Sequence, residues 1–172
     1  NAAPQVTQTF SVGPANQAIT FGTAPTIVVS GTGTVSAVGG ASGNPVVFTS
    51  ATTAVCTVSG ANGSTVTGVT AGTCTIRANQ AGSANYNAAP QATQNFSIGL
   101  ANQIITFGTA PTIAVGGAGS VSATGGASGN PVTFASTTAS VCTISGAIVT
   151  GVSAGTCIIS ANQVGNASYN AA

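Results

Sequence analysis

Charged side chains are almost missing from this chain of 172 residues. It contains no Asp, Glu, His or Lys and a single Arg, so 1% of its residues are charged, whereas a typical soluble domain has roughly 25%. General acid–base catalysis needs a side chain that titrates near the working pH, and neither a carboxylate nor an imidazole is present. A Ser nucleophile has no base to activate it. These absences predict a protein that is not an enzyme.

The same absences limit the ligands that the chain can bind. Calcium and magnesium sites lack their carboxylates, and zinc has only four Cys, without close CxxC pairs, so we expect no metal and no other cofactor. One Arg cannot neutralise a phosphate backbone, which argues against nucleic acid as a partner. The sequence has no apolar run of about 18 residues or more, so it predicts no transmembrane helix.

The sequence does contain an internal repeat. The segment NAAPQVTQTFSVG at the N-terminus recurs as NAAPQATQNFSIG from Asn87, and ITFGTAPTI at Ile19 recurs at Ile105, both at an offset of 86 residues. Later segments are offset by 83 residues, because the second copy is three residues shorter at the turn that contains Asn62–Gly63. A period of this length is too long for a solenoid and predicts two small tandem domains.

Within each repeat, apolar and polar residues alternate as they do in β-strands. In residues 73–78, Cys74, Ile76 and Ala78 share one face. Short runs of Val, Ile, Thr and Phe are bounded by Gly, Pro, Asn and Ser, and no period of 3.6 residues is sustained. The pattern predicts an all-β fold built from antiparallel sandwiches.

Two related runs of sequence point to a family. The run VCTVSG…TVTGVTAGTCTIRANQAGSANYNAAPQATQNFSI and its second copy VCTISG…IVTGVSAGTCIISANQVGNASYNAA resemble bacterial immunoglobulin-like repeats of long secreted and surface proteins. The resemblance covers almost the whole chain and is specific in the Cys pair and in the ANQxG and YNAAP motifs. It implies two tandem immunoglobulin-like antiparallel β-sandwich domains that serve as stalk or adhesive modules, outside the cell or on its surface, without catalytic residues.

The four Cys allow three disulfide connectivities. The repeat symmetry favours Cys56 with Cys74 and Cys142 with Cys157. Disulfides form and persist in oxidising compartments, so this pairing also predicts an extracellular location.

The sequence allows two interpretations of the roles of several other residues. Tyr86 and Tyr169 occupy identical contexts, where they either bury their rings at sandwich corners or stack on a glycan. Arg77 falls on the outer face of its strand, either as a solvated cation or as a contact for an anionic neighbour. Three Asn-x-Ser motifs, a type that also arises by chance in a chain rich in Asn and Ser, begin at Asn62, Asn95 and Asn166.

The predicted domains are out of phase with the chain by one strand. A first immunoglobulin-like repeat spans residues 16–101 and ends in a strand whose inward residues are Phe96 and Ile98. A second repeat spans residues 102–172 and lacks an equivalent of that strand. We therefore expect the second repeat to have an open hydrophobic groove.

A strand that fits this groove lies at the other end of the chain. Residues 1–15 copy the closing strand, and Val6, Phe10 and Val12 fall on one face of it. We expect this segment to belong to a neighbouring domain by donor-strand complementation, either in another copy or in an adjacent repeat of a longer chain.

The near-neutral composition agrees with self-association. Proteins near zero net charge lack electrostatic repulsion, and edge strands usually carry Lys to prevent edge pairing. The sequence predicts an extracellular structural protein whose repeats join end to end into a fibre, filament or surface stalk. The alternative is an adhesin module that binds a glycan or another host ligand.

Overall fold

The structure is a computed structural model that describes all 172 residues. It is all-β apart from one short 3₁₀ turn. Contacts divide it into two compact units. The first unit comprises Asn1–Thr26, Thr32–Thr67 and Thr73–Ser97, and the second comprises Ile27–Gly31, Gly68–Gly72 and Ile98–Ala172. No helix is long and apolar enough to cross a lipid bilayer.

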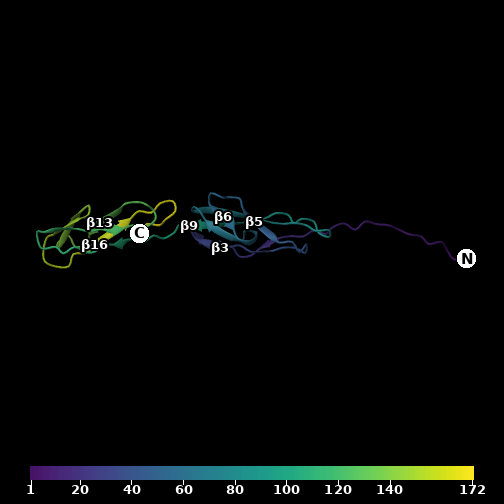
Figure 1. Cartoon of the computed structure of the whole chain (residues 1–172), viewed down its shortest axis with the longest axis horizontal. Coiled ribbons are helices and arrows are strands. Elements are labelled where there is room, and N and C mark those ends of the chain that lie inside the picture. The colour runs from purple at the N-terminus through teal and green to yellow at the C-terminus, as the bar shows by residue number, and fades with distance from the viewer. The chain divides into compact units, whose positions relative to one another are not determined.

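The first repeat contains nine strands in three sheets. The sheet orders are β2-β9-β8-β5, β3-β7-β6 and β1-β4, and Figure 1 labels several of these strands. Their bounds are β1 Thr20–Phe21, β2 Ile27–Val28, β3 Thr32–Thr34, β4 Ala37–Val38, β5 Val46–Ser50, β6 Cys56–Ser59, β7 Thr65–Gly68, β8 Gly72–Gln80 and β9 Ala92–Gly99.

Strand β8 shows how the alternating sequence builds the core. Cys74, Ile76 and Ala78 are buried, whereas Arg77 between them is exposed, because successive side chains of a strand point to opposite faces. β8 pairs antiparallel with β5, from Val46 opposite Gln80 to Ser50 opposite Ile76. The Cys56–Cys74 disulfide then ties β8 to β6, a strand of the three-stranded sheet.

Strand β9 ends the first repeat, and it makes a pair that the sequence did not predict. β2 runs parallel to β9, with Ile27 opposite Ile98 and Val28 opposite Gly99. The sequence predicts antiparallel sandwiches, and the strand pairs β1 with β4, β3 with β7 and β5 with β8 of this repeat are antiparallel. A parallel pair needs a long connection between its strands, and most of the first repeat lies between β2 and β9.

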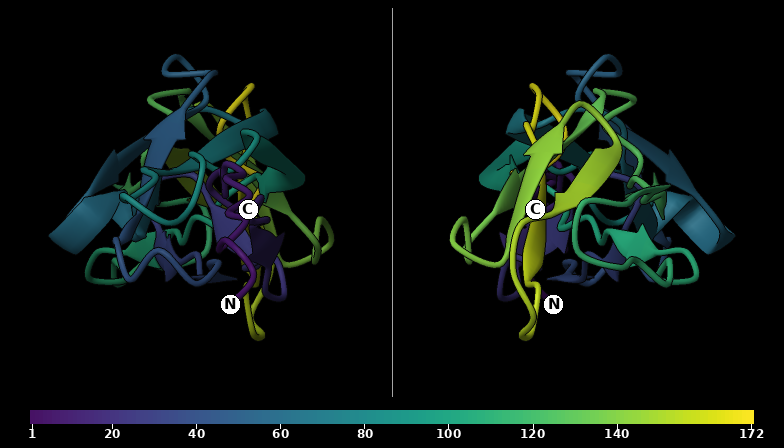
Figure 2. Two further views of the ribbon diagram at one scale, coloured as in Figure 1. Left: turned by 90° about the vertical axis from the view of Figure 1, so that its right-hand side faces the viewer. Right: turned by 90° about the vertical axis from the view of Figure 1, so that its left-hand side faces the viewer.

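The second repeat repeats most of this pattern but has fewer strands. Its sheets have the orders β11-β15-β14, β13-β16 and β10-β12, and β13 and β16 lie side by side in Figure 2 (right). No strand takes the place of β2 or β9. The bounds are β10 Thr106–Phe107, β11 Ala118–Ser120, β12 Ala123–Thr124, β13 Val132–Ser136, β14 Cys142–Ser145, β15 Ile148–Gly151 and β16 Ile159–Gln163.

The three-residue difference between the repeats lies in a hairpin loop. In the first repeat, η1 (Ala61–Gly63) joins β6 to β7, and Asn62 and Gly63 both have positive φ angles, of 55° and 74°. A Cβ on Gly63 would meet the Phe48 carbonyl, so this turn requires glycine. Two residues join β14 to β15 in the second repeat, and Gly146 has a φ of 58°. The core valine after each loop is buried in both repeats.

The N-terminal segment forms no strand. Residues 1–14 contain neither helix nor strand and are all exposed, and Figure 1 draws them as a purple coil. The exposed fractions of Val6, Phe10 and Val12 are 91%, 84% and 86%. When a partner covers a segment with this much apolar surface, the free energy of the system falls.

Candidate assembly site

The two repeats bury identical residues to different degrees. Cys74 in the first repeat is fully buried, whereas the equivalent Cys157 is exposed. The same trend holds for four core positions that carry the same amino acid in both repeats. At these positions the residue of the first repeat is buried, whereas its counterpart in the second repeat is half-buried. The pairs are Ile27 and Ile113, Val35 and Val121, Phe48 and Phe134, and Ile76 and Ile159. Side-chain chemistry therefore does not cause the difference.

The cause is the strand that the second repeat does not contain. In the first repeat, β9 lies between β8 and β2, whereas β16, the counterpart of β8, pairs with β13 alone. An open groove of about 320 Å³ remains beside it. Its apolar lining comes mainly from Phe107, Pro111, Ile113, Val121, Val149 and Ile159.

The segment next to the groove has also lost its strand geometry. Residues 113–114 match β2 in position, yet they form no strand, because β2 exists through its pairing with β9. The Ala114 carbonyl accepts from the Gly117 N–H, but the Val115 N–H, whose counterpart at Val29 donates to the Gly99 carbonyl, is available to a further strand.

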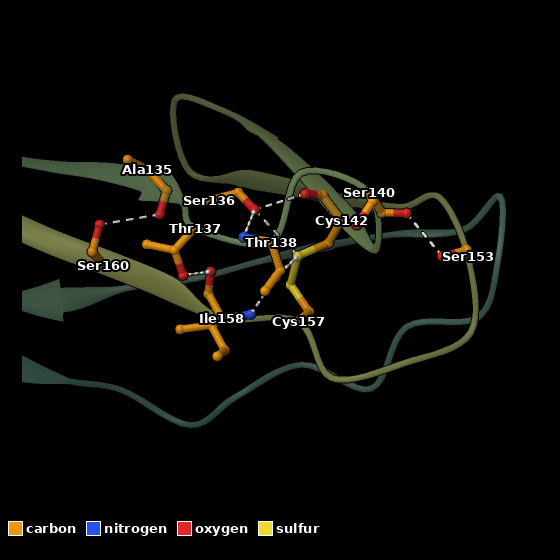
Figure 3. Close-up of a disulfide and its surroundings, with 10 residues drawn as sticks. All are labelled: Ala135, Ser136, Thr137, Thr138, Ser140, Cys142, Ser153, Cys157, Ile158 and Ser160. Atoms are coloured by element: carbon orange, nitrogen blue, oxygen red, sulfur yellow. Dashed lines mark hydrogen bonds between the residues drawn. A yellow bond between two sulfur atoms is a disulfide. The ribbon is translucent and has the colours of Figure 1, made fainter.

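The disulfides connect the pairs that the repeat symmetry favours. Cys56 is bonded to Cys74 and Cys142 to Cys157, with Cα–Cα distances of 5.7 and 5.5 Å, and no cysteine is free. Around the second bridge, Thr138 Oγ1 accepts a hydrogen bond from the Ile158 N–H (2.9 Å), and Ser136 Oγ donates one to the Cys142 carbonyl (2.7 Å), as Figure 3 shows. These bonds fix the chain at the end of the groove where Cys157 lies.

A pair of glutamines, buried except for the half-buried Gln103, stabilises each repeat, and the sequence patterns did not reveal it. Gln80 Oε1 accepts a hydrogen bond from the Gly40 N–H (2.7 Å), and its Nε2 donates to the Asn44 carbonyl (2.7 Å). Gln17 Oε1 accepts from the Ser42 N–H (3.0 Å). Gln103 and Gln163 make the equivalent bonds in the second repeat, to Ser128, Gly126 and Asn130. Neutral amides thus hold the GGASGN loops in a chain with almost no ion pairs to offer.

Replacement of Gln80 by Met is expected to destabilise the first repeat by roughly 2–4 kcal/mol. Met has a similar shape but leaves the Gly40 N–H and the Asn44 carbonyl without partners, and each buried unpaired group costs about 1–3 kcal/mol. Urea denaturation measures the loss. Gln91→Met is the control, since the amide of this exposed residue bonds only Asn79. Equal stability of the two variants would contradict the role of Gln80.

The structure places the other candidate residues as follows. Tyr86 and Tyr169 are half-buried and their hydroxyls have no hydrogen-bond partner in the chain, while their backbones form bridges with Ala15 and Ala101. Asn62, Asn95 and Asn166 are all exposed, and the Asn166 side chain also bonds the Ser128 carbonyl and the N–H groups of Ser168 and Tyr169. No three metal-ligating side chains lie together.

Comparisons with known proteins give no family. No protein-family model and no curated protein matches the sequence. Two solved structures of the surface-layer protein SbsC, one of its domains 1–6 and one a crystal structure of rSbsC(31-844), are similar over 86% of this chain, at 17% identity and a TM-score of 0.36. The chain spans about a quarter (26%) of each of them.

Proposed function

We propose that this chain is an extracellular structural protein whose immunoglobulin-like repeats, residues 16–101 and 102–172, join end to end into a fibre, filament or surface stalk. The observation that carries the proposal is the open groove of the second repeat. The first repeat fills the equivalent place with β9, and residues 1–13 are an exposed copy of the segment that forms β9. A strand from a neighbouring copy, or from an adjacent repeat of a longer polypeptide, closes the groove.

Strand β16, at the open side of the second repeat, has none of the features that usually prevent edge pairing. Edge strands are commonly protected by Lys, by Pro or by inward-pointing charges. β16 consists of Ile159–Gln163 and carries no charged residue, and the apolar groove adjoins it. This composition supports association with a further strand.

Strand exchange of this kind leads to an open assembly. The donor residues and the acceptor groove belong to different parts of the chain, so the contact is heterologous, and each added copy brings a new groove and a new donor. The two disulfides support an oxidising, extracellular location for it.

The adhesin alternative would need an exposed aromatic or polar platform for its ligand. Each of the two tyrosines is half-buried, and Phe10 and Phe107 are the exposed phenylalanines. Both of these belong to the proposed donor and acceptor, so a structural role accounts for them better than glycan binding does.

Electron microscopy and sedimentation velocity of the full chain test the proposal. We expect linear assemblies whose mean length grows with protein concentration, because the contact is heterologous. A chain without residues 1–13 is expected to remain monomeric. A full chain that is monomeric at every accessible concentration would refute the structural function, and assembly of the truncated chain would refute strand complementation.

A further inference from the structure

We infer that the groove of the second repeat is a peptide-binding site whose ligand is residues 4–13 of a second copy of this chain, bound in a single register. The inference rests on the proposed end-to-end association and specifies the residues that perform it. Four features of the structure, three of them contacts of β9 in the first repeat, specify this register.

The first feature is the backbone pairing of β2 with β9. Ile98 lies opposite Ile27, and the Val29 N–H donates a hydrogen bond of 2.9 Å to the Gly99 carbonyl. Ile98 corresponds to Val12 and Ile27 to Ile113 in the repeat. Val12 of the donor therefore lies opposite Ile113, and the donor runs parallel to residues 113–115.

The second feature is a cavity shaped by a glycine. In the first repeat, a Cβ on Gly68 would lie 2.9 Å from Cγ2 of Ile98, so glycine leaves the room that Ile98 occupies. Gly151 is the equivalent glycine, and a Cβ there would lie 3.3 Å from Cγ2 of Ile113, with no Ile98 counterpart beside it. The site selects a branched aliphatic side chain, and Val12 supplies it.

The third feature is a polar contact in the middle of the strand. Gln94 Nε2 donates a hydrogen bond of 2.8 Å to the Gly22 carbonyl. The corresponding residues are Gln8 in the donor and Gly108, which lines the groove. An amide at this position rejects a register shifted by one residue, because the shift would turn Gln8 away from the groove.

The fourth feature sets where the donor begins. Ala172 exchanges hydrogen bonds with Gln163, through its N–H (3.0 Å) and its carbonyl (2.8 Å). In the first repeat, Ala89 occupies this place and donates to the Gln80 carbonyl (3.1 Å). Residues 170–172 thus already fill the positions that residues 1–3 of a donor would take, and the bound segment starts at Pro4.

Side-chain parity then divides the donor into two faces. In β9, Gln94, Phe96 and Ile98 are buried or half-buried, whereas Asn95 and Ser97 are exposed. The donor segment differs from the corresponding segment of the first repeat only at Val6, Thr9 and Val12. Val12 and Phe10 therefore face the groove, and Ser11 faces solvent.

Two substitutions in the full chain test the register by adding the same charge to opposite faces. Val12→Asp is expected to weaken association at least about 100-fold, because it places an unpaired carboxylate in an apolar site. Ser11→Asp, one residue away, is expected to change it less than about threefold. Sedimentation velocity measures the association constant of each variant. Equal effects of the two substitutions, or normal assembly of Val12→Asp, would overturn the register.

A synthetic peptide of residues 4–13 locates the site directly. A photoreactive phenylalanine analogue at Phe10 is expected to cross-link saturably to the lining of the groove, within residues 107–121 or at Ile159. The same peptide with Val12→Asp is the control and should not cross-link. Cross-links confined to the first repeat, or the same yield from both peptides, would refute the site.

The two proposals fail in different ways. If the peptide cross-links saturably to the groove but the full chain never assembles, the structural function is refuted and the peptide-binding site is supported. Assembly that persists in Val12→Asp would keep the function and remove the site.

Discussion

A chain extended after Ala172 by a second copy of residues 4–13 is expected to have a much more stable second repeat than the chain itself. The added segment, PQVTQTFSVG, continues from the alanine that is already paired with Gln163. It follows Ala172 as Pro90 follows Ala89 in the first repeat. The groove is then filled from within the same chain, so no second copy is needed to close it.

The expected gain follows from the surface that the extension covers. Full burial of a Val side chain contributes about 1.5–3 kcal/mol, and the Phe that follows the pattern of Phe96 adds to it. Ordering ten more residues offsets part of this gain. A net gain of about 3 kcal/mol would raise the melting temperature of a domain of this size by roughly 12–24 °C.

Differential scanning calorimetry of the extended and original chains measures the change. The matched control carries the same extension with Asp at the position copied from Val12, and its melting temperature should stay close to that of the original chain. The extended chain should also stop assembling, although it keeps residues 1–13, because its acceptor groove is occupied. An unchanged melting temperature, or an equal rise in the Asp control, would contradict strand closure.

The sequence was most informative about elements whose residues repeat. The alternation of Cys74, Ile76 and Ala78 predicted a strand with one buried face, and the structure confirms it. The offset between the repeats also indicated which strand the second repeat would not contain, because that inference needs only the order of segments along the chain. The immunoglobulin-like sandwich and the domain bounds remain predictions.

Features that depend on partners distant in sequence were not predictable. The parallel pairing of Ile27 with Ile98 joins segments about 70 residues apart. The residues of one strand do not specify whether a distant partner strand runs parallel or antiparallel to it. The buried role of Gln17 and Gln80 was missed because glutamine is usually a surface residue. Their amides are buried only because two glycines let the loop backbone approach them closely.

In the chain without residues 1–13, which keeps the groove open, mild reducing conditions are expected to reduce the Cys142–Cys157 disulfide at least about ten times faster than Cys56–Cys74. A thiolate reagent must reach a sulfur atom along the bond that it breaks. Cys56 and Cys74 are both fully buried, so their exchange requires local or global opening of the first repeat. Cys157 is exposed and lines the open groove, so a reagent reaches the second bridge without such an opening.

Timed alkylation followed by peptide mapping measures both rates in one sample. In urea that unfolds both repeats the two rates should converge, because the loops of 18 and 15 residues differ little and burial no longer distinguishes the bridges. Saturation with the peptide of residues 4–13 should slow the reduction of Cys142–Cys157 but not that of Cys56–Cys74. The Val12→Asp peptide should slow neither. Equal rates in the folded truncated chain, or faster reduction of Cys56–Cys74, would contradict an open groove beside Cys157.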